Sequence, residues 1–217
     1  MSRGLFDDDD TEADAVLPLA PGAVLLRRFA LTTAKALLAD AAAVRAQAPL
    51  RHMRTPGGLP LRVAMTNCGP LGWVSDARGY RYQATDPASG QPWPALPASF
   101  AALANSAAAQ AGYAGFAPDA CLVNRYEPGT VLSLHQDKNE RDFGQPIVSV
   151  SLGLSAVFLF GGMARSDRPA RIPLHHGDVV VWGGPARLRF HGVMALEDGR
   201  HEDAGRQRIN LTMRRAG

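Results

Sequence analysis

The sequence of 217 residues is poor in cysteine and has no long hydrophobic run. Its two cysteines, Cys68 and Cys121, form neither a CxxC motif nor a disulfide framework. Apolar runs such as Ala156–Phe160 are far shorter than the roughly 20 residues that a membrane-spanning helix needs. The acidic run Asp7–Asp10 stands where a secretory signal has basic residues. We therefore expect a globular cytoplasmic protein with no membrane partner.

Lysine is also scarce, because 21 of the 23 basic residues are arginine. The net charge of +3 hides an asymmetry: residues 1–14 hold six acids and one base, whereas the rest of the chain holds 22 bases and 14 acids. Such an excess attracts polyanions, and arginine suits phosphate groups. A coding bias in this alanine-rich chain is the alternative explanation. We expect a flexible acidic tail over residues 1–18 and a single domain over residues 19–217.

The first half of the chain predicts two helices with a loop-rich segment between them. Residues 30–48 carry apolar side chains at helical spacing, and residues 98–111 form a second helical stretch. Residues 22–29 suit a short strand. Residues 50–97 are dense in glycine and proline, with aromatic residues interspersed. Because this is the chemistry of turns, we expect loops and short hairpins there that form a lid over a site.

From about residue 119 to the C-terminus, short runs with a period of two are separated by glycine and proline. Many short strands without intervening helices are typical of an antiparallel sandwich or a jelly roll. The sequence thus predicts a mainly β fold with flanking helices. The expected strands cover residues 120–126, 131–135, 147–152, 156–160, 171–173, 178–182 and 208–214.

A candidate metal site begins with His135 and Asp137, which are two residues apart. On an extended segment, side chains two residues apart point to the same face, so both can reach one ion. His191 offers a third ligand. Two histidines and one carboxylate leave open positions and suit non-haem Fe(II). An HxD sequence also occurs by chance, and other histidines are present in turns or charged loops, namely His52, His175, His176 and His201.

The last predicted strand places polar side chains on one face and apolar side chains on the other. Arg208, Asn210, Thr212 and Arg214 alternate with aliphatic residues. The common explanation is an edge strand with a solvated polar face. The other explanation is a polar cavity inside a barrel, where two arginine forks could hold the two ends of a dicarboxylic acid.

Together these residues resemble the AlkB family of Fe(II)/2-oxoglutarate dioxygenases. The resemblance covers almost the whole chain from about residue 20, and it is carried by the spacing His135-x-Asp137, His191 and Arg208-x-Asn210-x-Thr212-x-Arg214. Further matching segments are residues 55–58, 65–69, 71–73, 79–80, 92–95, 124–129, 132–138, 147–154 and 176–184. The resemblance implies a double-stranded β-helix, or jelly roll, over about residues 119–217. It also implies that residues 50–97 form a nucleotide-recognition lid.

The family implies a metal centre and a co-substrate pocket. Fe(II) would be held by His135, Asp137 and His191, with 2-oxoglutarate and O₂ as co-substrates. Arg208 would lie near the keto-acid end of 2-oxoglutarate, and Arg214 would grip the distal carboxylate. The resemblance completes this pocket with Asn124, Tyr126 and Asn210.

The resemblance also predicts the residues that contact a nucleic-acid substrate. Trp73, Tyr80 and Tyr82 match lid positions that contact the substrate strand. Trp182 matches an inner position beside the flipped base, which it would stack against His135. Arg165 matches a basic position near the target.

One position departs from the family pattern. The repair enzymes have an acidic residue two positions after the metal-binding aspartate, where it contacts the exocyclic amine of the damaged base. Asn139 stands there in this sequence, so the preferred lesion is open.

The activity that the resemblance implies is oxidative demethylation of bases of the 1-methyladenine and 3-methylcytosine type. The products are formaldehyde, succinate and CO₂. The substrate would be methylated DNA as a single strand or a flipped base, with RNA as an open alternative, and the enzyme a monomer. Three alternatives remain at this point: a 2-oxoglutarate hydroxylase of a protein or small molecule, a non-catalytic jelly roll that binds nucleic acid, and a plain metal-binding barrel.

Overall fold

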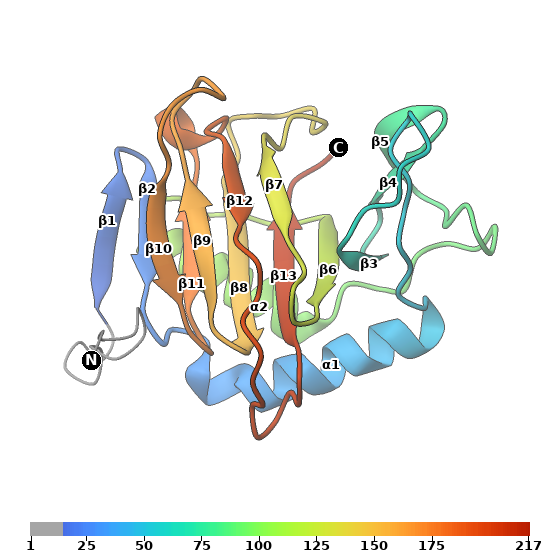
Figure 1. Ribbon diagram of the computed structural model, residues 1–217, viewed down its shortest axis with the longest axis horizontal. Helices are drawn as coiled ribbons and strands as arrows, with labels where there is room; N and C mark the ends of the chain where they lie inside the picture. Colours follow the sequence, from blue (N-terminus) through green and yellow to red (C-terminus); the bar gives the residue numbers. More distant parts are fainter. Residues whose placement is uncertain (1–14) are drawn as a thin grey trace.

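Two antiparallel sheets packed face to face form the body of the protein, in a computed structural model that describes residues 15–217 (Figure 1). This arrangement confirms the predicted jelly roll with flanking helices. The larger sheet has the order β1-β2-β11-β8-β13-β6-β3 and the smaller sheet the order β10-β9-β12-β7. The strands of the larger sheet are β1 Val16–Ala20, β2 Ala23–Leu26, β3 Ala64–Cys68, β6 Ala120–Tyr126, β8 Ile147–Gly153, β11 Val179–Trp182 and β13 Arg208–Arg214. Those of the smaller sheet are β7 Leu132–His135, β9 Ala156–Phe160, β10 Ala170–Leu174 and β12 His191–Val193.

Two alanine-rich helices, α1 (Ala34–Gln47) and α2 (Ala98–Gln110), cover the outer face of the larger sheet. On α1, the buried residues Leu37, Ala41 and Val44 recur every three or four positions and therefore form one apolar stripe. They pack in one core with apolar side chains from both helices and from β6, β8, β11 and β13. This packing leaves the opposite face of the larger sheet to meet the smaller sheet.

Strand β13 carries its polar face into the space between the two sheets. It lies in the middle of the larger sheet, between β8 and β6, and all seven of its residues are buried. Ile209, Leu211 and Met213 belong to the core under the helices. Since side chains alternate along a strand, Arg208 and Arg214 must point to the inner side. The edge-strand explanation is therefore wrong, and the polar side chains of β13 face the space between the two sheets.

Three local predictions differ from the structure. Val16–Pro18 lie in β1, which is paired with β2, so this part of the expected tail is ordered; residues 1–14 lie outside the described residues. Within the expected lid segment, β3 is instead a fully buried edge strand of the larger sheet, paired with β6. The short strand β12, which begins at His191, is not predicted from the sequence.

The rest of the loop-rich segment includes a hairpin formed by β4 (Gly72–Asp76) and β5 (Gly79–Gln83). Figure 1 shows this hairpin beside β3, at one side of the two sheets. A 3-10 turn at Leu31–Thr33 precedes α1, and another covers Gly184–Ala186. Among residues 15–217, no helix is both long and apolar enough to cross a bilayer.

Candidate metal centre and co-substrate pocket

Three predicted ligands converge at one end of the smaller sheet. His135 ends β7, Asp137 follows two residues later, and His191 begins β12, where it is the register partner of His135. The Nε2 atoms of His135 and His191 lie 3.8 Å and 3.5 Å from the carboxylate oxygens of Asp137. All three ligand atoms lie within 4.8 Å of one another. A single ion can therefore be bound by two imidazoles and one carboxylate, a donor set that suits Fe(II).

Backbone carbonyls select the tautomer that a metal ligand needs. Nδ1 of His135 lies 2.9 Å from the carbonyl oxygen of Ser133, and Nδ1 of His191 lies 3.0 Å from that of Arg189. A carbonyl only accepts, so Nδ1 must carry the proton and Nε2 keeps its lone pair for a metal. Burial and the neighbouring His191 lower the pKa of His135 to about 4. At neutral pH this imidazole is therefore uncharged and can bind a metal without losing a proton.

A second pair of histidines has the opposite tautomer. His176 and His201 lie ring against ring, with centroids 4.2 Å apart. Nδ1 of His176 accepts the N–H of Gly153, and Nδ1 of His201 accepts the N–H of Asp203. Nε2 must then carry the proton in the neutral rings, which makes it a poor metal ligand. This pair therefore adds no ligand to the predicted set.

Arg214 and Arg187 hold Asp137 from two sides. Arg214 donates from Nε (3.1 Å) and Nη2 (2.5 Å) to Oδ2 of Asp137, and Arg187 donates to its backbone oxygen at 2.8 Å. Burial alone would raise the pKa of Asp137, but the charge of Arg214 outweighs it and holds the pKa well below its ordinary value. The carboxylate is thus ionised and oriented for a cation.

Glu140 links this cluster to the β4–β5 hairpin. Its carboxylate lies 3.0 Å from Nη2 of Arg187 and 3.3 Å from Nε of Arg214, and it accepts the hydroxyl of Tyr82 at 2.7 Å. Arg187 and Glu140 are not among the predicted site residues, because most of their partners are distant in sequence. The one available signal is that Glu140 lies three residues after Asp137, on the same short segment.

The pocket next to the metal site has polar groups with unused hydrogen-bonding capacity. Asn124 and Asn210 are register partners on β6 and β13, and Nδ2 of Asn124 donates to Oδ1 of Asn210 at 3.1 Å. Arg208 is 1% exposed; it donates from Nη2 to Ser151 at 2.8 Å, and its guanidinium lies over the ring of Tyr126 at 4.9 Å. Its Nε and Nη1 have no partner among residues 15–217, and neither has Oδ1 of Asn124.

A carboxylate co-substrate fits this pocket. A buried guanidinium without an acidic partner is costly, and a bidentate carboxylate would satisfy both of its unused N–H groups. Burial also lowers the pKa of Arg208, and its neighbour Tyr126 offsets this only in part. The free N–H groups of Arg208 and the hydroxyl of Ser151 are therefore suited to one end of 2-oxoglutarate.

The two arginines of β13 have different surroundings. Arg214 contacts the metal ligand Asp137, so it lies at the metal end of the site. Arg208 begins the same strand, six residues away, and it contacts Ser151 and Tyr126 and no member of the triad among residues 15–217. Which end of 2-oxoglutarate each arginine binds stays a prediction.

The predicted substrate residues fall into two groups. Trp73 and Tyr80 stack on the hairpin with ring centroids 5.7 Å apart, and Nε1 of Trp73 donates to Oδ1 of Asn139 at 3.0 Å. Tyr82 faces Glu140, as described above. Arg165 is exposed, with its guanidinium 5.2 Å from the ring centre of Phe190. The hairpin therefore meets the segment that follows the metal ligand.

Trp182 belongs to the other group. It is 1% exposed, stands edge-on to His191 at 5.0 Å and packs near Phe158. Trp182 thus supports the ring of a metal ligand. That Trp182 stacks on a flipped base stays a prediction.

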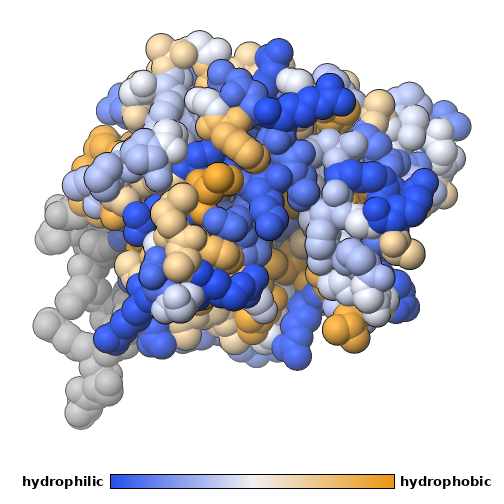
Figure 2. All heavy atoms as spheres, turned by 90° about the horizontal axis from the view of Figure 1, so that it is seen from above, coloured by the Kyte–Doolittle hydropathy of each residue, from blue (hydrophilic) through white to orange (hydrophobic). Residues whose placement is uncertain are grey.

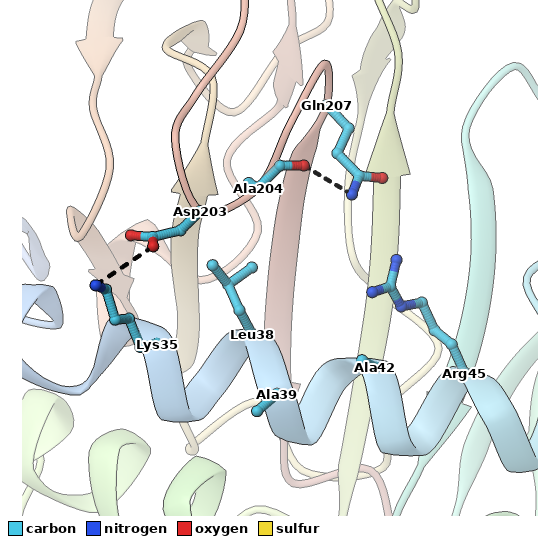
Figure 3. A pocket seen from close by; sticks show the side chains of 8 residues that line it. All are labelled: Lys35, Leu38, Ala39, Ala42, Arg45, Asp203, Ala204 and Gln207. Carbon is cyan, nitrogen blue, oxygen red and sulfur yellow. Dashed lines mark hydrogen bonds and ion pairs between the residues drawn. The ribbon is translucent and has the colours of Figure 1, made fainter.

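A groove of about 410 Å³ lies elsewhere, between α1 and the segment that leads into β13 (Figure 3). In Figure 3, Lys35 points to Asp203 at one end and Arg45 stands at the other, with Leu38 between them. None of the predicted metal, co-substrate or substrate residues lines it. The groove is thus separate from the site that the triad defines.

A jelly roll with a two-histidine, one-carboxylate triad and a buried arginine pocket defines a non-haem iron oxygenase that uses a carboxylate co-substrate. The family profile described as the 2OG-Fe(II) oxygenase superfamily matches residues 22–214. The alpha-ketoglutarate-dependent dioxygenase AlkB of Salmonella typhimurium is 59% identical over 212 residues, which are 98% of this chain and 97% of that protein. AlkB of Escherichia coli is 56% identical over 200 residues, or 92% and 93% of the two chains.

More distant relatives share the fold. A solved structure of OsALKBH1 superposes with a TM-score of 0.79 at 28% identity and covers 93% of this chain and 100% of the other. The tRNA demethylase abh1 of Schizosaccharomyces pombe is 44% identical over 75 residues, only 25% of its length. The chain therefore belongs to the AlkB family of the 2OG-Fe(II) oxygenases, whose chemistry requires Fe(II), 2-oxoglutarate and O₂.

The Glu140 cluster leads to a stability prediction. Glu140→Gln removes the charge that compensates two buried arginines, and breaking a buried ion pair costs about 3–5 kcal/mol. Glu127→Gln is the matched control, because Glu127 is exposed and its carboxylate lies 3.5 Å from Arg125. Exposed ion pairs of this kind contribute less than about 1 kcal/mol. Urea unfolding at neutral pH should show this loss in the free energy of unfolding for Glu140→Gln and not for Glu127→Gln. Equal losses would contradict the assigned role of Glu140.

Proposed function

We propose that this oxygenase removes methyl groups from ring nitrogens of N-alkylated bases in DNA, on a single strand or on a flipped base. The observation that carries the proposal is the contact between hairpin and metal segment. Trp73, stacked with Tyr80, is hydrogen-bonded to Asn139, two residues after the ligand Asp137. An aromatic pair beside a metal centre offers a stacking surface to an unpaired base, worth about 1–3 kcal/mol per base.

In this proposal, residues 50–97 outside β3 act as the nucleotide-recognition lid. His135, Asp137 and His191 would hold Fe(II), Arg208 would bind the distal carboxylate of 2-oxoglutarate, and Arg214 would orient the metal end. The iron, 2-oxoglutarate and O₂ supply the oxidising chemistry. The residues of the chain fix the position of each group and exclude water from the space between the sheets.

The surface supports a polyanionic substrate. Residues 15–217 hold eight more bases than acids. Seen from above, the protein is covered mainly by hydrophilic residues, with apolar side chains in small groups and no broad apolar patch (Figure 2). Such a face suits a charged nucleic-acid strand better than an apolar partner. The names of two relatives, the tRNA demethylase abh1 and the nucleic acid dioxygenase ALKBH1 of Mus musculus, agree with a nucleic-acid substrate and make RNA a second candidate to test.

The test is to incubate the protein with Fe(II), 2-oxoglutarate, air and oligonucleotides that carry one 1-methyladenine or 3-methylcytosine. We expect formaldehyde and succinate to be released in equal amounts, with the base restored. The unmethylated oligonucleotide is the control. Succinate without formaldehyde from any methylated DNA or RNA would contradict the proposal and favour a protein or small-molecule substrate. Monomeric state and cytoplasmic location stay predictions.

A further inference from the structure

Asn139, two residues after the metal ligand Asp137, has its amide oxygen occupied and its amide donors free in the described part of the chain. Its Oδ1 accepts the indole N–H of Trp73 at 3.0 Å. The indole nitrogen can only donate, so the amide atom that faces it must be the oxygen. The NH₂ group of Asn139 therefore points away from Trp73, and it has no hydrogen-bond partner within residues 15–217.

The charge at this position points in the same direction. Asn139 is neutral, and its neighbour Lys138 is exposed and positive. The adjacent carboxylate of Glu140 is buried and already paired with Arg187 and Arg214. Residues 138–140 therefore offer no uncompensated negative charge that could attract a cationic base.

From these observations we infer that Asn139 selects bases that carry a carbonyl oxygen at position 4 of a pyrimidine or position 6 of a purine, next to the methylated ring nitrogen. This inference rests on the proposed demethylase function and specifies its substrate class. In 3-methyluracil and 3-methylthymine the group at position 4, and in 1-methylguanine the group at position 6, is a carbonyl, an acceptor, and the base is neutral. In 3-methylcytosine the group at position 4, and in 1-methyladenine the group at position 6, is an amine, a donor, and the base is cationic. An NH₂ group complements the first set and faces the second set donor to donor.

The sharpest comparison uses 3-methyluracil and 3-methylcytosine in the same DNA oligonucleotide, because the two pyrimidines differ only at position 4 and in charge. Both substrates compete in one reaction, and the ratio of their kcat/KM values is measured by mass spectrometry. This ratio is independent of the fraction of folded or iron-loaded enzyme. A general loss of structure would therefore leave it unchanged.

Three variants test the inference. Asn139→Asp provides an acceptor and a negative charge, so the ratio of keto to amino substrate should fall on the order of tenfold relative to wild type. Asn139→Ala provides neither group and should give an intermediate ratio. Trp73→Phe removes the indole N–H that orients the amide, so it should lower the ratio in the wild-type background. In the Asn139→Asp background, Trp73→Phe should leave the ratio unchanged, because both atoms of a carboxylate are acceptors.

The outcomes separate this inference from the proposed function. Demethylation with the same ratio in wild type and Asn139→Asp would overturn the inference and leave the demethylase function intact. A ratio that rises in Asn139→Asp would also overturn it. If neither wild type nor Asn139→Asp restores any of the methylated bases, while both proteins still consume 2-oxoglutarate, the proposed function fails and the inference fails with it.

Discussion

Asp137→Ala is expected to abolish both demethylation and the consumption of 2-oxoglutarate. The carboxylate is the one anionic ligand of the triad, and it lies 3.8 Å and 3.5 Å from the two imidazole Nε2 atoms. Without it, the site consists of two neutral imidazoles beside the positive charge of Arg214. That charge repels a divalent cation when no carboxylate compensates it. Iron affinity should therefore fall below detection at micromolar protein.

The control separates metal loss from unfolding. Asp137→Asn keeps the shape of the side chain and an oxygen that can accept from Arg214, so it should fold and yet fail to be stabilised by added metal. Asp198→Ala is the matched exposed change, because Asp198 pairs with Arg206 at 2.6 Å with 64% of its side chain exposed. We expect metal-dependent increases in Tm for wild type and Asp198→Ala, and none for either Asp137 variant. Turnover by an Asp137 variant would refute the ligand assignment.

Patterns that are local in sequence predicted much of the fold and the metal site. His135 and Asp137 share a face because they are two residues apart on extended chain. The polar face of Arg208–Arg214 follows from the same alternation, and so do most of the strands after residue 119. These features need only the backbone period, which a single sequence contains.

Features set by distant partners could not be predicted in this way. Strand β12 has three residues and includes Gly192, where an added Cβ would lie 2.6 Å from the carbonyl oxygen of Leu132. It is a strand because β7 and β9 flank it, and its own composition does not indicate this. Strand β3 is buried on both faces and mixes Thr66 and Asn67 with apolar residues, so it shows no alternation.

The roles of the two arginines were beyond sequence reasoning for a related reason. Arg208 and Arg214 occupy equivalent positions on one face of one strand, and either could serve either end of a dicarboxylate. The difference arises from Asp137, which lies 77 residues from Arg214 in sequence and within hydrogen-bond distance in the fold. The position of Glu140 between Arg187 and Arg214 depends on the same long-range packing.

Arg208→Met is expected to weaken 2-oxoglutarate binding strongly while leaving the ligand-free protein as stable as wild type, or more stable. Loss of two charge-assisted hydrogen bonds costs about 3 kcal/mol or more, which corresponds to at least roughly a hundredfold higher KM for 2-oxoglutarate. The ligand-free pocket, by contrast, buries a guanidinium whose Nε and Nη1 have no partner in the described chain. Replacing it with an apolar side chain of similar length removes that desolvation penalty.

Arg27→Met should produce the reverse pattern and is therefore the matched control. Arg27 is also buried, with 10% of its side chain exposed, but it pairs with the fully buried carboxylate of Asp178 at 2.7 Å. Its removal leaves that charge uncompensated and should lower the free energy of unfolding by about 3–5 kcal/mol, with no change in the KM for 2-oxoglutarate. Urea unfolding without co-substrate and steady-state kinetics measure the two effects separately. A destabilised Arg208→Met with an unchanged KM would show that Arg208 is a structural residue and that the carboxylate of 2-oxoglutarate binds elsewhere.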